Sequence, residues 1–153
     1  MALHSTPFTL PDSGLLTPEG KATSSRAMIG GPTLVMIGHK DCKTTRQTLP
    51  FIDRIHKDGG RAMAVMQDTP EDAKAAFAKL GLTLPFVSEP DPFAFSRAVG
   101  IATVPTLLFV ETDGTVSLTS EAFRRPDINA FATRLGAPIP VIANDTMPGF
   151  KPG

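Results

Sequence analysis

Residues 33–50 have the sequence TLVMIGHKDCKTTRQTLP, and this stretch decides the fold. Its first six residues form a short, mostly apolar run after a Gly-Gly-Pro turn, which is typical of a strand buried on both faces of a sheet. A polar turn follows, and apolar side chains then recur at helical spacing, at Leu49, Ile52 and Ile55. The stretch therefore predicts a central strand that leads into a helix beginning at or near Cys42.

The rest of the chain continues this alternation of strands and helices. Apolar runs and turn residues predict strands at 61–66, 85–88, 106–110 and 116–119, and helices at 70–80, 91–99 and 126–135. The order favours one α/β domain over residues 1–136, with a central mixed sheet flanked by helices on both faces. Residues 1–31 form a loop-rich N-terminal extension with a short strand at 8–10. The Pro-rich tail, residues 137–153, is expected to be extended or partly disordered. Arg124-Arg125 is expected to be a solvated pair, with contact to an anion as the alternative.

The composition is that of an ordinary globular protein. The chain has 153 residues, 41% of them hydrophobic, and its 15 basic residues balance 15 acidic ones. Such a balance gives no net field to attract nucleic acid or an anionic membrane, and no apolar stretch is long enough to cross a bilayer. We therefore expect neither nucleic acid nor membrane as a partner. The opening residues lack the order of a secretory signal, so a cytoplasmic location is expected unless such a signal has been removed.

Cys42 is the single cysteine of the chain. A lone cysteine excludes an intramolecular disulfide and the zinc sites that need several such ligands, so we predict no metal and no cofactor. Its position, after a strand and in the first turn of a helix, is where open α/β sheets carry their sites and where free N–H groups favour negative charge. His39, Lys40 and Lys43 also favour the nucleophilic thiolate, while Asp41 opposes it. Cys42 is thus a candidate nucleophile, and the alternative is a buried, small apolar residue.

Residues 41–50, DCKTTRQTLP, resemble the W-C-P-P-C-R-x-E-L-P segment of thioredoxin-like thiol:disulfide oxidoreductases of the TlpA and ResA type. An arginine and a Leu-Pro pair fix the alignment, and Pro50 corresponds to the proline that bends the family's helix. The resemblance implies that Cys42 is the attacking cysteine and that Thr45 replaces the resolving cysteine, which gives the motif C-x-x-T. One helical turn separates the two, so the Thr45 hydroxyl either donates a hydrogen bond to the thiolate or bonds only to nearby backbone or water.

Two further segments strengthen the resemblance. FTLPD at residues 8–12 is similar to the F-x-L-P-D opening of the redoxin and TlpA group, and VGIATVPT at residues 99–106 is similar to its Y-G-V-x-x-x-P-T segment. In that family the proline is cis and faces the active cysteine. The resemblance therefore implies a thioredoxin-like fold in which Val104, Pro105 and Thr106 bind the substrate. From the residues alone, Pro105 also fits a simple proline at the start of a strand.

These observations lead to several hypotheses about function. In the first, Cys42 exchanges disulfides with proteins or low-molecular-weight thiols, and an external thiol resolves the mixed disulfide. In the second, the chain is a degenerate binding module that uses the groove around Val104-Pro105 without catalysis. A one-cysteine peroxiredoxin-like peroxidase is a third, although the P-x-x-x-T-x-x-C motif of that family would need threonine at His39 and proline at Val35. A glutaredoxin-like iron–sulfur carrier lacks its C-G-F-S segment here. Whether the protein is an enzyme, and its oligomeric state, stay open at this point.

Overall fold

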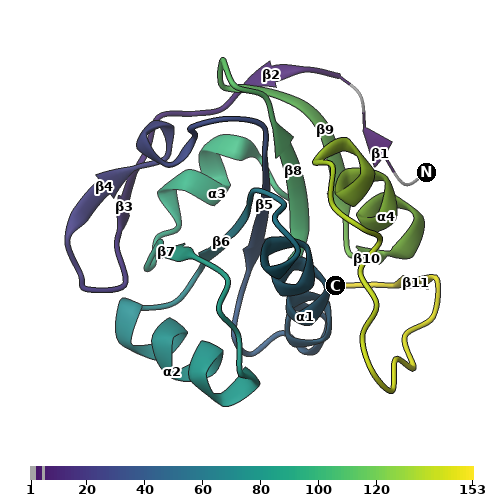
Figure 1. The fold of residues 1–153 in the computed structure, drawn as a ribbon. Helices are drawn as coiled ribbons and strands as arrows, with labels where there is room; N and C mark the ends of the chain where they lie inside the picture. Colours follow the sequence, from purple (N-terminus) through teal and green to yellow (C-terminus); the bar gives the residue numbers. More distant parts are fainter. Residues whose placement is uncertain (1–2, 5) are drawn as a thin grey trace.

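The computed structural model describes residues 3–4 and 6–153, so residues 1, 2 and 5 of the predicted domain lie outside the described part. The helices are α1 (Lys43–Lys57), α2 (Pro70–Leu80), α3 (Ala94–Val99) and α4 (Arg125–Arg134), with a short 3-10 helix η1 (Arg26–Met28). The strands are β1 (Leu3–His4), β2 (Phe8–Thr9), β3 (Gly14–Leu16), β4 (Ala22–Ser24), β5 (Thr33–Gly38), β6 (Ala62–Met66), β7 (Phe86–Ser88), β8 (Thr106–Val110), β9 (Thr115–Glu121), β10 (Phe123–Arg124) and β11 (Phe150–Lys151). Figure 1 shows these helices on both faces of a twisted sheet.

Strand β5 lies inside the sheet, and all six of its residues are buried. It pairs in parallel with β6 and antiparallel with β8. Within the described residues the sheet has nine strands in the order β1-β9-β8-β5-β6-β7-β3-β4, and β2 also pairs with β9. The N-terminal extension thus supplies the edge strand on each side. The mixed sheet with helices on both faces confirms the predicted fold class.

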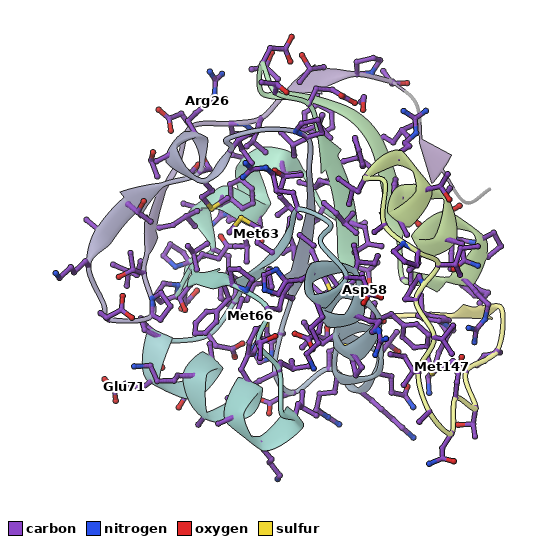
Figure 2. The ribbon with its side chains drawn as sticks, in the orientation of Figure 1. Arg26, Asp58, Met63, Met66, Glu71 and Met147 are labelled. Carbon is purple, nitrogen blue, oxygen red and sulfur yellow. The ribbon has the colours of Figure 1, made fainter. Side chains whose placement is uncertain are left out.

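Two apolar cores form on the two faces of the sheet because side chains alternate along the buried strands. In β6, Ala62, Ala64 and Met66 belong to the core beneath α1, α2 and α4. Met63 and Val65 belong to the opposite core, which α3 covers. Met63 and Met66 are labelled in Figure 2, where both lie in the interior of the molecule. The apolar run of this strand is continuous because the strand is buried on both faces.

The ends of α2 and α3 follow the conformations of their flanking residues. Thr69 caps α2 by accepting a hydrogen bond from the Asp72 N–H at 3.2 Å, and Gly81 ends that helix in a left-handed conformation (φ 68°), so the helix has the predicted bounds. Helix α3 begins at Ala94, later than predicted, because Phe93 before it is also left-handed (φ 60°). No helix among the described residues is both long and apolar enough to cross a membrane.

The tail, residues 137–153, packs against the domain. Its Met147, labelled in Figure 2, contributes to the core beneath α1 and α4. Arg125 holds the tail with two nitrogens: Nη1 lies 2.7 Å from a carboxylate oxygen of Asp145, and Nη2 donates to the Met147 carbonyl at 2.7 Å. Strand β11 of the tail then pairs with β10. Arg125 is therefore not simply solvated: it forms the alternative contact with an anion, here the Asp145 carboxylate.

Candidate functional site

Cys42 lies at the junction of β5 and α1, where the central strand ends. It is the N-cap residue of α1, with an extended backbone (φ −82°, ψ 119°) and a partly exposed side chain. Its Sγ accepts a hydrogen bond from the backbone N–H of Thr45 at 3.4 Å, and its thiol donates one to the carbonyl oxygen of Val104 at 3.5 Å. The cysteine is thus a polar capping group at a helix N-terminus and not a buried apolar residue.

The Thr45 side chain is fully buried beneath the turn that carries Cys42. Its hydroxyl accepts a hydrogen bond from the backbone N–H of His39 at 3.4 Å. Its methyl group faces Gly38 so closely that a β-carbon on this glycine would lie 2.6 Å away. Among the described residues no hydrogen bond joins the hydroxyl to Sγ, since the bond to sulfur comes from the Thr45 backbone N–H. The sequence predicts that this hydroxyl bonds either to the Cys42 thiolate or to nearby backbone or water. In the structure it bonds to the backbone, at the His39 N–H.

The loop before β8 faces Cys42. The peptide bond between Val104 and Pro105 is cis, Pro105 is buried and Val104 is partly exposed. Thr106 begins β8, and its buried hydroxyl donates to the Thr103 carbonyl at 2.7 Å. Because β8 runs antiparallel to β5, the beginning of β8 meets the end of β5. The structure therefore brings the predicted substrate-binding residues to the predicted nucleophile.

The three basic residues expected to favour a thiolate each lie in a different environment. The His39 ring accepts the Asp41 N–H at Nδ1 (3.1 Å), and its Nε2 lies 3.5 Å from a carboxylate oxygen of Asp68. The Lys40 ammonium pairs with the Asp41 carboxylate at 3.2 Å, and this hydrogen bond raises the pKa of Lys40. Lys43 is exposed as the first residue of α1. In the described part of the chain, no hydrogen bond or ion pair joins these side chains to the sulfur, so any influence on it acts through the field of their charges.

Asp68 is a buried residue of this region that the sequence analysis did not single out. It accepts the Lys40 N–H at 3.1 Å and so fixes the turn that precedes Cys42. Burial raises the pKa of Asp68, while the Lys40 N–H and the nearby His39 act to lower it. The residue follows β6, whose carboxyl end lies beside that of β5, and the convergence of parallel strand ends would have identified it. Over the residues with described positions, no cluster of three or more acidic, His or Cys side chains is suited to a metal ion.

A shallow hollow of about 290 Å³ adjoins the loop before Pro105. Its lining residues are Gln67, Phe93, Ser96, Arg97 and 101–104. Beneath it, the buried Glu89 carboxylate accepts hydrogen bonds from the Ser96 hydroxyl and from the Ser96 N–H, the latter at 3.0 Å. Burial raises the pKa of Glu89, although these bonds oppose the effect. The carboxylate thus holds the start of α3, which forms one wall of the hollow.

The structure also brings two residues of the tail to the site. The Thr44 hydroxyl, in the first turn of α1, donates to the Pro152 carbonyl at 2.6 Å. Gly153 packs so closely on the Val104 carbonyl that a β-carbon at this glycine would overlap the oxygen. The first contact joins residues 108 positions apart, and the second also joins segments far apart in the chain, so no local pattern in the sequence predicts them.

Comparisons with known proteins agree with this geometry at the level of the fold. No protein-family model matches the sequence, and the search of curated proteins gave no match. Among solved structures, a thiol:disulfide interchange protein from Bacteroides sp. matches with a TM-score of 0.72 and 19% identity, over 87% of this chain and 91% of that one. The thioredoxin domain of a thiol-disulfide oxidoreductase from Bacteroides vulgatus matches with a TM-score of 0.70 and 16% identity, over 84% and 96%.

A third match is a thiol:disulfide interchange protein of the thioredoxin family from Chlorobium tepidum, with a TM-score of 0.63 and 18% identity over 86% and 98%. The matches cover most of each chain, while the identities are low. They agree with the thioredoxin-like fold that the resemblance of three sequence segments implies. The chain has the thioredoxin-like fold.

Proposed function

We propose that the protein exchanges thiols and disulfides through Cys42 as a monothiol. The observation that carries this proposal is the position of Sγ, which caps α1, is partly exposed and lies 3.5 Å from the carbonyl oxygen of Val104. A sulfur that receives a backbone N–H at a helix N-terminus is in a setting that stabilises negative charge. Solved structures with the same fold are described as thiol:disulfide interchange proteins, which supports the same class of chemistry.

The exchange takes two steps. The Cys42 thiolate attacks one sulfur of a partner disulfide, so that a new S–S bond joins Cys42 to one half of the partner and the other half leaves as a thiolate. An external thiolate then attacks this mixed disulfide, takes over the partner half and releases Cys42 as a thiolate. One disulfide is consumed and one is formed in each step, so no further oxidant or reductant is required. The external thiol is needed because Thr45 has no sulfur with which to perform the second step.

The partners of this exchange are disulfides of proteins or of low-molecular-weight thiols. A peptide partner would lie along the loop at Val104, which brings its disulfide to Cys42. The neighbouring hollow offers apolar side chains, Phe93 and Ile101, together with the cationic Arg97. This lining suits an apolar or acidic side chain of the partner next to its cysteine.

The test is a comparison of the native thiol with a thiol placed elsewhere on the same protein. The substrate is a peptide whose cysteine is joined to a coloured aromatic thiol, and the release of that thiol gives the rate. We expect Cys42→Ser to abolish the reaction, and the double variant Cys42→Ser/Lys74→Cys, with its thiol on the exposed face of α2, to react at least about ten-fold more slowly than the wild type. Equal rates for the native and the relocated thiol would refute the proposal.

A binding module is the second candidate function, because the hollow beside Val104 exists whether or not Cys42 reacts. In this case a peptide is held without a covalent bond. Capture that survives Cys42→Ala and fails in Val104→Glu or Thr106→Ala identifies this function, whereas capture that requires the thiol identifies exchange.

A further inference from the structure

Residues 152–153, here called the covering segment, lie across the place where a partner would approach Cys42. The Thr44 hydroxyl on α1 donates to its Pro152 carbonyl at 2.6 Å. On the other side, its Gly153 packs against the Val104 carbonyl, the same oxygen that accepts the Cys42 thiol. The covering segment therefore contacts both α1 and the loop before β8. Figure 1 shows the chain returning beside α1 after β11.

The approach of the covering segment to the loop depends on glycine. A β-carbon on Gly153 would overlap the Val104 oxygen and lie 2.6 Å from the hydroxyl of Thr103. The absence of a side chain allows the backbone to come this close. Gly149, only four residues earlier, has no atom within 4 Å of the corresponding position. The two glycines thus form a natural pair for comparison.

The path of the tail is set by contacts away from Cys42. Asp145 accepts both Arg125 Nη nitrogens, at 2.7 and 3.2 Å, and also the Met147 N–H at 2.8 Å. The Arg124 guanidinium lies 4.3 Å from the centre of the Phe150 ring. Beyond β11, the Thr44 hydroxyl supplies the hydrogen bond that holds the covering segment at the site. Several contacts hold the tail away from Cys42, whereas one hydrogen bond holds the covering segment at the site. The covering segment can therefore detach locally while the rest of the domain stays folded.

We propose that the covering segment is an intramolecular competitor for the groove beside Cys42, so that a peptide partner enters only after this segment leaves. The inference rests on the proposed function, since it takes Val104 as the place where a partner's backbone lies. Reagents that need only the sulfur reach Cys42, which is partly exposed with the segment in place. Extended peptides need the surface that Pro152 and Gly153 occupy, and they are excluded until it opens.

The experiment compares two alkylating reagents on the full chain. One is N-ethylmaleimide, and the other is a maleimide carried by a short extended peptide, so that the ratio of their rates at Cys42 reports access to the groove. Neither reagent requires disulfide exchange. The variants are Gly153→Ala, which creates the overlap with Val104, and Asp145→Ala, which removes the anchor far from the thiol. Gly149→Ala is the matched control.

We expect Gly153→Ala and Asp145→Ala to raise the ratio of peptide-maleimide to N-ethylmaleimide rates about five-fold, the factor that corresponds to one lost hydrogen bond. Gly149→Ala should leave the ratio unchanged because its methyl group enters open space. Unchanged ratios in both tail variants overturn the competitor role, even if the wild type exchanges disulfides. Raised ratios in a protein that exchanges no disulfide uphold the covering role and refute the exchange function.

Discussion

Replacement of Thr45 by valine tests whether the Thr45 hydroxyl stabilises the Cys42 thiolate or only bonds to the backbone of the preceding turn. Valine keeps the shape of threonine and removes only the hydroxyl, which here accepts the His39 N–H at 3.4 Å. Serine, the matched control, keeps the hydroxyl and removes the methyl group that faces Gly38. The hydrogen bond to the Cys42 sulfur comes from the backbone of residue 45, so neither substitution removes it.

The structure predicts that both substitutions at Thr45 lower the stability of the protein but leave the reactivity of Cys42 nearly unchanged. We expect Thr45→Val to lower the free energy of unfolding by about 1 kcal/mol, because a partly buried N–H loses its acceptor. Thr45→Ser should cost a similar amount, about 1 kcal/mol, through the loss of one buried methyl group. The rate of alkylation of Cys42 by iodoacetamide should stay within about two-fold of the wild type in both variants, since the donor to sulfur is unchanged.

The assays are urea denaturation for stability and single-site alkylation followed by mass spectrometry for reactivity. A hydroxyl that stabilised the thiolate would contribute about 1.5 kcal/mol or more, which corresponds to roughly a ten-fold change in rate. A ten-fold loss of alkylation in Thr45→Val that Thr45→Ser does not share would refute the assignment of this hydroxyl to the backbone.

Three further predictions concern the surroundings of the site. Gly38→Ala should lower the free energy of unfolding by about 1–3 kcal/mol in urea denaturation, because its methyl group would lie 2.6 Å from that of Thr45; an unchanged value would contradict this close packing. Burial raises the pKa of Glu89 above 4.5, so its ionisation opposes folding. The stability of the wild type relative to Glu89→Gln should therefore be highest below pH 4.5 and fall as the pH rises through the raised pKa, and a pH-independent difference in unfolding free energy would exclude this. Arg125→Lys should lower the free energy of unfolding by about 1 kcal/mol, since lysine cannot form the two-pronged contact with Asp145; equal urea midpoints would argue against the clamp.

Much of the fold could be predicted because its signals are local. The apolar runs of β5, β6 and β8 are buried on both faces, as such runs predict. Helix α2 begins after the threonine cap Thr69 and ends at Gly81, where the sequence places both signals. The position of Cys42 at the junction of strand and helix follows from the same two patterns, whereas the loop at Pro105 opposite it was implied only by the resemblance to a known family. Local patterns were sufficient for the strands, the helix and the position of Cys42 because the residues that signal each strand or helix lie within that element or directly beside it.

The details of the site depended on contacts that are distant in the sequence or set by rotation of a helix. The Thr45 hydroxyl can face either the sulfur or the preceding turn, and the choice depends on how α1 sits against Gly38 at the end of β5. His39 is near Cys42 in sequence, yet its ring is drawn to Asp68, which lies on another strand end. The return of the tail depends on Arg125 meeting a partner 20 residues later. Such pairings have no period in the sequence from which they could be predicted.

The most direct test of the proposed exchange is intact-protein mass spectrometry after incubation with a low-molecular-weight disulfide. We predict that one half of the disulfide becomes attached to Cys42, that an equal amount of the other half is released as free thiol, and that added external thiol restores the original mass. Peptide mapping should place the adduct on Cys42, and Cys42→Ser should remain unmodified. A wild-type chain that gains no mass, or an adduct that persists in excess external thiol, would contradict a monothiol that is resolved from outside.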